Sequence, residues 1–196
     1  MISMDNDFIL SLYRRPETVF SVDEIAQLFP HLSTESLRNR LYYFSKSGKL
    51  KRLHTGIYAK EGYNNFELVN KLYKPSYISL ETVLSRGGVI FQYYETIFAV
   101  SYVTREVRLN NLGIQYRRVK GPVLTNLTGI NRENGYFIAS LERAFLDAIY
   151  VYKNYHFDNL RGLDWDKVAV FKTIYNNAIL EKKVEEYYQT FKEENA

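Results

Sequence analysis

Seven cations and no acid lie between Arg38 and Lys60, and a surface of this kind can bind a polyanion. The run comprises Arg38, Arg40, Lys46, Lys49, Lys51, Arg52 and Lys60. Because the whole chain of 196 residues has a net charge of +4, the rest of it carries −3. Such a local concentration of positive charge is typical of a site that contacts nucleic-acid phosphates.

Residues that could support catalysis or bind a metal are scarce. The chain has no Cys, its three His are far apart, and it contains no G-x-S-x-G, phosphate-binding glycine loop or HExxH motif. The group Asp158, Asp164 and Asp166 could bind a metal in a DNA-processing enzyme, but acids before a helix usually cap it. We therefore expect a protein that is not an enzyme, with no catalytic residue, metal or cofactor.

Composition and the first residues indicate a globular, cytoplasmic protein. Apolar residues make up 46% of the chain and charged residues 24%, which are ordinary values for a folded domain. The opening stretch "MISMDNDFIL" has acids where a signal peptide needs Lys or Arg. No apolar stretch approaches the length of a membrane span, so we expect no membrane partner.

Three short helices are expected in the first 48 residues. The first spans residues 5–14 and stops before Pro16. In the second, "SVDEIAQLF", Ser21 and Glu24 form a capping box ahead of an apolar stripe. The third, residues 34–47, follows Ser33 as its cap and ends at Gly48.

A basic hairpin, "KLKRLHTGIYAK" at residues 49–60, follows these helices at once. Three helices and a two-stranded hairpin in this order predict a winged helix-turn-helix over residues 1–60, with the hairpin as the wing. Residues 61–196 predict a second domain, because strand-like runs alternate there with turn signals before a mostly apolar helix, "LERAFLDAIYVY". The expected fold class is α+β, a winged helix-turn-helix followed by a mixed α+β domain.

The third helix and the wing carry the residues expected to bind DNA. With Leu37, Leu41 and Phe44 turned inward, the helix presents its other faces to the major groove, where Arg38 can pair with guanine and Asn39 with adenine. The wing residues would contact phosphates or the minor groove, and they would contribute more to affinity than to sequence specificity. The candidate DNA-binding residues are Thr34, Ser36, Arg38, Asn39, Arg40, Tyr42, Lys46, Lys49, Lys51, Arg52 and His54.

A second group of cations lies on the predicted strands of the second domain. These residues are Arg105, Arg108, Arg117, Arg118 and Lys120. They would form either a solvated sheet face or a secondary surface for DNA or for antitoxin activity.

Four motifs in order resemble the AbiEi-type antitoxins, the regulator half of bacterial AbiE toxin–antitoxin systems. They are "SVDEIAQLFPHLSTESLRNRLYYFSKSGKL", "KRLHTGIYA", "SYISLETVLSRGGV" and "IASLERAFLDAIY", and they cover about residues 20–150. The last carries the family's signature at Glu142, Arg143, Ala144, Leu146, Asp147 and Tyr150. Ser140-Leu141 stands where many members have a proline before the Glu.

The resemblance implies an autorepressor that binds inverted repeats in the double-stranded DNA of its own promoter. Such repeats would need two bound copies, and a monomer can assemble on them cooperatively. It also implies an antitoxin that neutralises a nucleotidyltransferase-type toxin in phage abortive infection. Members are mostly described as type IV antitoxins, which need no stable complex with the toxin, although some relatives act by contact. The alternative is a ligand-responsive winged-helix regulator without a toxin partner. The apolar helix from residue 141 is expected to be core, with Glu142 and Asp147 structural.

Overall fold

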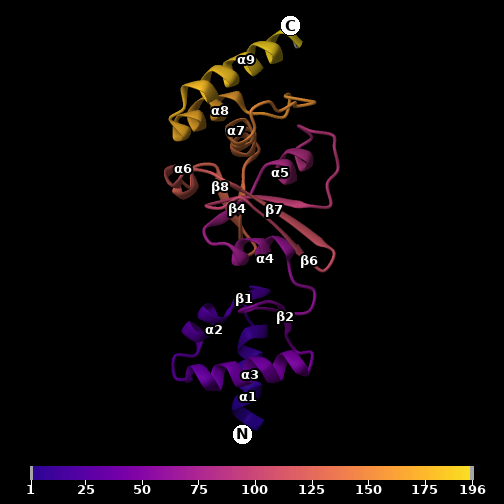
Figure 1. The fold of residues 1–196 in the computed structure, drawn as a ribbon, viewed down its shortest axis with the longest axis vertical. Helices are drawn as coiled ribbons and strands as arrows, with labels where there is room; N and C mark the ends of the chain where they lie inside the picture. Colours follow the sequence, from indigo (N-terminus) through magenta and orange to yellow (C-terminus); the bar gives the residue numbers. More distant parts are fainter. Residues whose placement is uncertain (1, 195–196) are drawn as a thin grey trace. The chain divides into compact units, whose positions relative to one another are not determined.

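The chain has an α+β fold made of two compact units, one ending at Leu72 and the other beginning at Tyr73 (Figure 1). The computed structural model describes the backbone of residues 2–194 and the side chains of residues 7–193. No helix within that described part is both long enough and apolar enough to cross a lipid bilayer.

The described part of the first unit contains a small antiparallel sheet and four helices. In chain order its elements are α1 (Ile2–Tyr13), β1 (Val19–Ser21), α2 (Val22–Leu28), α3 (Thr34–Lys46), β2 (Lys51–His54), β3 (Ile57–Ala59) and α4 (Asn65–Leu72). The strand order is β1-β3-β2, so β1 pairs with the far edge of the β2–β3 hairpin. Strand β1 was not expected from the sequence, because its pairing partner is remote along the chain.

Helices α2 and α3 begin where their capping residues predict. Ser21 Oγ accepts from Glu24 N at 3.2 Å, and Glu24 Oε2 accepts from Ser21 N at 2.9 Å, which confirms the capping box. Ser33 Oγ accepts from Ser36 N at 3.2 Å and caps α3. The apolar stripes of the helices meet in one core, which contains Phe8, Ile9, Leu12, Phe20, Ile25, Leu37, Leu41, Phe44, Leu50 and Tyr58.

Helix α4 belongs to the first unit, so this unit extends past the boundary at residue 60 expected from the sequence. The buried carboxylate of Glu67 accepts hydrogen bonds from the backbone N and the Oγ1 of Thr18, at 2.8 and 2.6 Å. Lys71 Nζ also pairs with Glu24 of α2. These polar contacts reach back along the chain, and local sequence patterns do not reveal them.

The second unit contains a mixed six-stranded sheet with the order β6-β7-β5-β4-β9-β8. The strands are β4 (Ser76–Ile78), β5 (Ile97–Ser101), β6 (Arg105–Leu109), β7 (Leu112–Arg118), β8 (Ile130–Glu133) and β9 (Tyr136–Ala139). The pairs β5–β7 and β4–β9 are parallel, and the others are antiparallel. Two of the turn signals expected from the sequence are confirmed, because Asn110 and Asn134 have positive φ at the tips of two hairpins, whereas the third, Gly121-Pro122, begins a helix.

Helices α5 (Glu81–Arg86) and α7 (Leu141–Val151) cover one face of this sheet (Figure 1). Helices α8 (Trp165–Phe171) and α9 (Ala178–Glu194) pack on α7, and η1 (Lys172–Tyr175) joins them. The short α6 (Gly121–Thr125) follows β7. Helix α7 is core, as expected, because every residue from Glu142 to Ile149 is buried.

Arg143 and Asp147 of α7 lie in a buried polar network. Arg143 and Asp147 are both fully buried, and Arg143 Nε lies 3.5 Å from Asp147 Oδ1. The Asp147 carboxylate accepts from the hydroxyls of Ser79 at 2.7 Å, Tyr175 at 2.6 Å and Tyr77 at 3.1 Å. These contacts join strand β4, helix α7 and η1, so both residues have a structural role.

The guanidinium of Arg143 also binds the backbone around α6. It donates to the carbonyls of Val123 at 2.7 Å and Thr128 at 3.0 Å. Burial opposes its charge, but Asp147 and two tyrosine hydroxyls together raise the pKa of Arg143. A charged guanidinium therefore organises this core.

Candidate nucleic-acid interface

Helix α3 presents most of its surface to solvent because only one stripe is buried. Leu37, Leu41 and Phe44 are the buried residues of this helix. Gly48, with φ +74°, ends the helix in the left-handed region and turns the chain into the hairpin. The exposed faces of α3 and the hairpin are therefore joined by a very short connection.

The hairpin has one exposed strand and one buried strand. Three of the four residues of β2 are exposed, whereas all three residues of β3 are buried. Gly56, with φ +75°, allows the tight turn between the strands, and the register shifts between Arg52 and His54. The basic side chains of β2 therefore face solvent from a strand that β3 fixes to the core.

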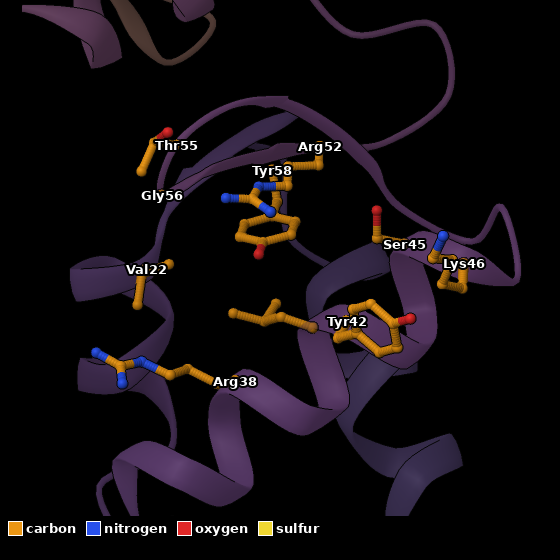
Figure 2. A pocket seen from close by; sticks show the side chains of 10 residues that line it. Val22, Arg38, Tyr42, Ser45, Lys46, Arg52, Thr55, Gly56 and Tyr58 are labelled. Atoms are coloured by element: carbon orange, nitrogen blue, oxygen red, sulfur yellow. The ribbon is translucent and has the colours of Figure 1, made fainter.

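A cavity of about 820 Å³ lies between α3 and the hairpin, and we call it the α3–hairpin cleft (Figure 2). Three cations, Arg38, Lys46 and Arg52, lie around it, and no acid lines it. Figure 2 shows Arg38 extending past Val22 and Lys46 on the opposite side of the cleft. The cleft is lined by Val22, Arg38, Leu41, Tyr42, Ser45, Lys46, Arg52, Thr55, Gly56 and Tyr58.

Four of the expected DNA-binding residues, Arg38, Tyr42, Lys46 and Arg52, line this cleft together. The side chain of Lys46 also lies 5.7 Å from the ring centroid of Tyr42, in cation–π contact. Five others are exposed without lining it: Thr34, Asn39, Lys49, Lys51 and His54. Lys51 lies 2.7 Å from Glu61 Oε1, so its charge is partly offset by an acid just outside the cationic run.

Two expected residues lie on a different side of α3. Ser36 and Arg40 are only half-exposed, and the guanidinium of Arg40 lies 5.8 Å from the ring centroid of Phe8 in α1. Arg40 therefore packs against the first helix and does not join the cations at the cleft. Helical spacing alone could not show that Arg40 meets another helix.

Lys60 is buried, so it does not belong to the cationic surface although it ends the acid-free run. Its ammonium donates to the carbonyls of Tyr13 and Arg15 at the end of α1. Burial lowers the pKa of Lys60, and the nearby Glu67 and Glu17 oppose that change.

The cations of the second unit do not share one surface. Arg105 pairs with Tyr116 and Arg108 with Gly113 across β6–β7, so alternation places Arg105 and Arg118 on one face and Arg108 and Arg117 on the other. Arg117 is half-buried and donates to Gln115 Oε1 at 3.0 Å. Lys120 lies beyond β7, as the residue before α6. The expected secondary surface of five cations is therefore divided.

Two of the three aspartates considered for a metal site have separate structural contacts, and Asp166 is exposed in the first turn of α8. Asp164 Oδ1 accepts from Lys167 N and caps α8, and this contact lowers the pKa of Asp164. Asp158 Oδ2 accepts from Phe91 N at 2.8 Å. Within the described residues, no three His, Cys, Asp or Glu side chains come together as a metal-binding group.

Sequence reasoning missed several polar residues of the cleft, namely Ser45, Thr55 and Tyr58. Ser45 could have been found, because it lies seven residues after Arg38 and hence on the same side of the helix. Tyr58 could not, because its hydroxyl enters the cleft only once β3 is paired within the sheet (Figure 2).

Comparison of the chain with protein-family models and with curated protein sequences gives no significant match.

Proposed function

We propose that this protein is a DNA-binding autorepressor and antitoxin whose first unit is a winged helix-turn-helix. The observation that carries the DNA-binding part is the α3–hairpin cleft, which is lined by three cations from helix and hairpin and by no acid. In a winged helix-turn-helix, α3 would enter the major groove and the β2–β3 hairpin would serve as the wing. Phosphates are the natural partners of such a surface.

A duplex-binding titration with a charge-reversed variant tests this part. Lys46→Glu with Arg52→Glu should abolish binding to the DNA upstream of this gene, because two attractions become repulsions at one cleft. Arg132→Glu with Arg161→Glu is the matched control, since both residues are exposed cations of the second unit. Equal affinity of the cleft variant and the control would contradict DNA binding at this cleft.

The antitoxin part of the proposal rests on the order of the four motifs in the sequence. The buried Arg143–Asp147 pair explains why this signature would be needed, since it holds the second unit together. By the same argument, neutralisation of a nucleotidyltransferase-type toxin would come from the unit's surface and not from the signature itself.

Co-expression with the neighbouring gene tests the antitoxin part. The full-length chain should restore the growth of cells that express a neighbouring nucleotidyltransferase, and the charge-reversed cleft variant should do so equally well. A genome without such a neighbouring gene would instead favour a ligand-responsive regulator.

A further inference from the structure

We propose that the α3–hairpin cleft holds the sugar–phosphate backbone of one DNA strand, so that Glu35 and Asn39, and not Arg38, select the sequence. This inference rests on the proposed DNA-binding function and assigns separate parts to residues of that surface. It reverses the expectation from sequence alone, in which Arg38 pairs with guanine.

The lining of the cleft suits a nucleic-acid backbone. Arg38, Lys46 and Arg52 supply positive charge for phosphates. The hydroxyls of Ser45, Thr55 and Tyr58 can donate to phosphate oxygens, and Val22 and Leu41 offer apolar contact for a sugar. The cleft therefore offers each kind of contact that a sugar–phosphate chain uses.

Groove geometry places a backbone in this cleft. The major groove is about 12 Å wide and admits an α-helix, and each groove is bordered by the backbones of the two strands. If α3 lies in the major groove and the hairpin lies at the neighbouring minor groove, the strand that separates the grooves must pass between them. The space between them is the α3–hairpin cleft.

Arg38 is on the side of α3 that faces this space. Successive residues of a helix are about 100° apart, so Arg38 and Ser45 share the hairpin side of α3. Figure 2 shows the guanidinium of Arg38 extending past Val22 on the α2 side of the cleft. From there it meets phosphates, which are the same in every sequence, and adds affinity without sequence choice.

Glu35 and Asn39 lie opposite the buried stripe, where α3 would face the floor of the groove. Both side chains are exposed, and both are about 160–200° around the helix from Leu37. A carboxylate beside phosphates is repelled, but at a base edge Glu35 can accept from the N4 amino group of cytosine. Asn39 can make two hydrogen bonds to adenine.

Selection from a random duplex library, followed by salt titration, tests the assignment in the full-length chain. The Arg38→Ala variant should select the same motif as the wild type, with lower affinity for matched and mismatched duplexes alike. Its salt slope should be shallower by about 0.9 for the one lost phosphate contact.

The variants Asn39→Ala and Glu35→Gln should each lose preference at one position of the motif, by about 5- to 150-fold. Their salt slopes should not become shallower, and Glu35→Gln should bind mismatched duplexes at least as tightly as the wild type, because a repelling charge is gone. Arg161→Ala, an exposed cation of the second unit, is the control for loss of one charge. Thermal unfolding of each variant excludes misfolding as the cause.

Two results would overturn the inference. One is a changed base preference in Arg38→Ala with an unchanged salt slope, and the other is an intact motif in both Glu35→Gln and Asn39→Ala. Failure of the proposed function would look different, since the wild-type chain itself would then show no salt-dependent binding to any duplex.

Discussion

Replacing Asp147 with asparagine tests the buried ion pair at the centre of the second unit. The change keeps the size of the side chain and one acceptor oxygen but removes the charge that faces Arg143 at 3.5 Å. Arg143 would keep only neutral partners, chiefly the carbonyls of Val123 and Thr128. A full positive charge would then lie in a site with no exposure to water.

The expected loss can be worked out from these contacts. Removing one partner of a buried ion pair costs about 3–5 kcal/mol, so we expect this loss for Asp147→Asn. Asp147→Ala should lose more, because the hydroxyls of Ser79, Tyr77 and Tyr175 would also lose their acceptor, at about 1–3 kcal/mol each. A domain is stable by about 5–15 kcal/mol in total, so the loss in Asp147→Ala could unfold the unit. The asparagine variant is therefore the one to measure.

Urea unfolding followed by tryptophan fluorescence measures this loss in the right unit. The chain has one tryptophan, Trp165, which packs against Phe145, Tyr188 and Phe191 in the second unit. Its fluorescence therefore reports unfolding of this unit and not of the first. Asp166→Asn is the matched control, because Asp166 is exposed at the start of α8, and its effect should stay within about 0.5 kcal/mol.

A loss below about 1 kcal/mol in Asp147→Asn would refute the reasoning, because the backbone carbonyls alone would then satisfy the guanidinium. A double-mutant cycle with Arg143→Met adds a second check. The double variant should lose less than the two single variants together, by at least about 1 kcal/mol, since no unpaired charge remains. Simple additivity would show that the two side chains do not depend on each other.

Three further predictions concern single side chains. Leu146→Ala should cost about 2–5 kcal/mol in the same fluorescence assay, because Leu146 is fully buried, and an unchanged midpoint would contradict that burial. Burial raises the pKa of Glu81 above 4.5, although the hydrogen bond from Tyr152 opposes this. In the folded protein Glu81 therefore keeps its proton to a higher pH than in the unfolded chain. The wild type should lose stability as pH rises above 4.5, by at most about 1.4 kcal/mol per pH unit. Glu81→Gln should lack this decline, and parallel pH curves for the two proteins would refute the assignment. Ser21→Ala should destabilise α2 by about 1 kcal/mol, seen as faster amide hydrogen exchange in that helix, whereas unchanged exchange would show that the capping box contributes nothing.

Local sequence rules predicted the elements that depend on local contacts. The capping residues Ser21 and Ser33 begin α2 and α3 because their hydroxyls accept from backbone N–H groups three residues later. Asn110 and Asn134 lie in hairpin turns because asparagine tolerates a positive φ. In each case the deciding atoms lie within a few residues of each other, so one stretch of sequence contains the whole cause.

Elements that depend on remote partners could not be predicted in this way. Strand β1 has three residues, and it is a strand because it pairs with β3, almost forty residues away. Strand β8 has a near partner in β9, but its residues INRE include one apolar side chain and give no alternating pattern from which a strand could be predicted. Helix α4 lies in the range expected for the second domain, 61–196, but the hydrogen bonds between Thr18 and Glu67 make it part of the first unit.

In the candidate site, likewise, the sequence predicts how many cations there are but not which of them share a surface. A count of cations along residues 38–60 treats all of them as one surface, yet Lys60 turns inward to the end of α1 and Arg40 packs on Phe8. Charge is a property of the side chain alone, but membership of a surface depends on which elements pack together. The cleft has cations from both α3 and β2 because Leu41 of α3 and Tyr58 of β3, the strand that pairs with β2, lie in one core. That shared anchoring is why the two elements could bind the same stretch of DNA backbone.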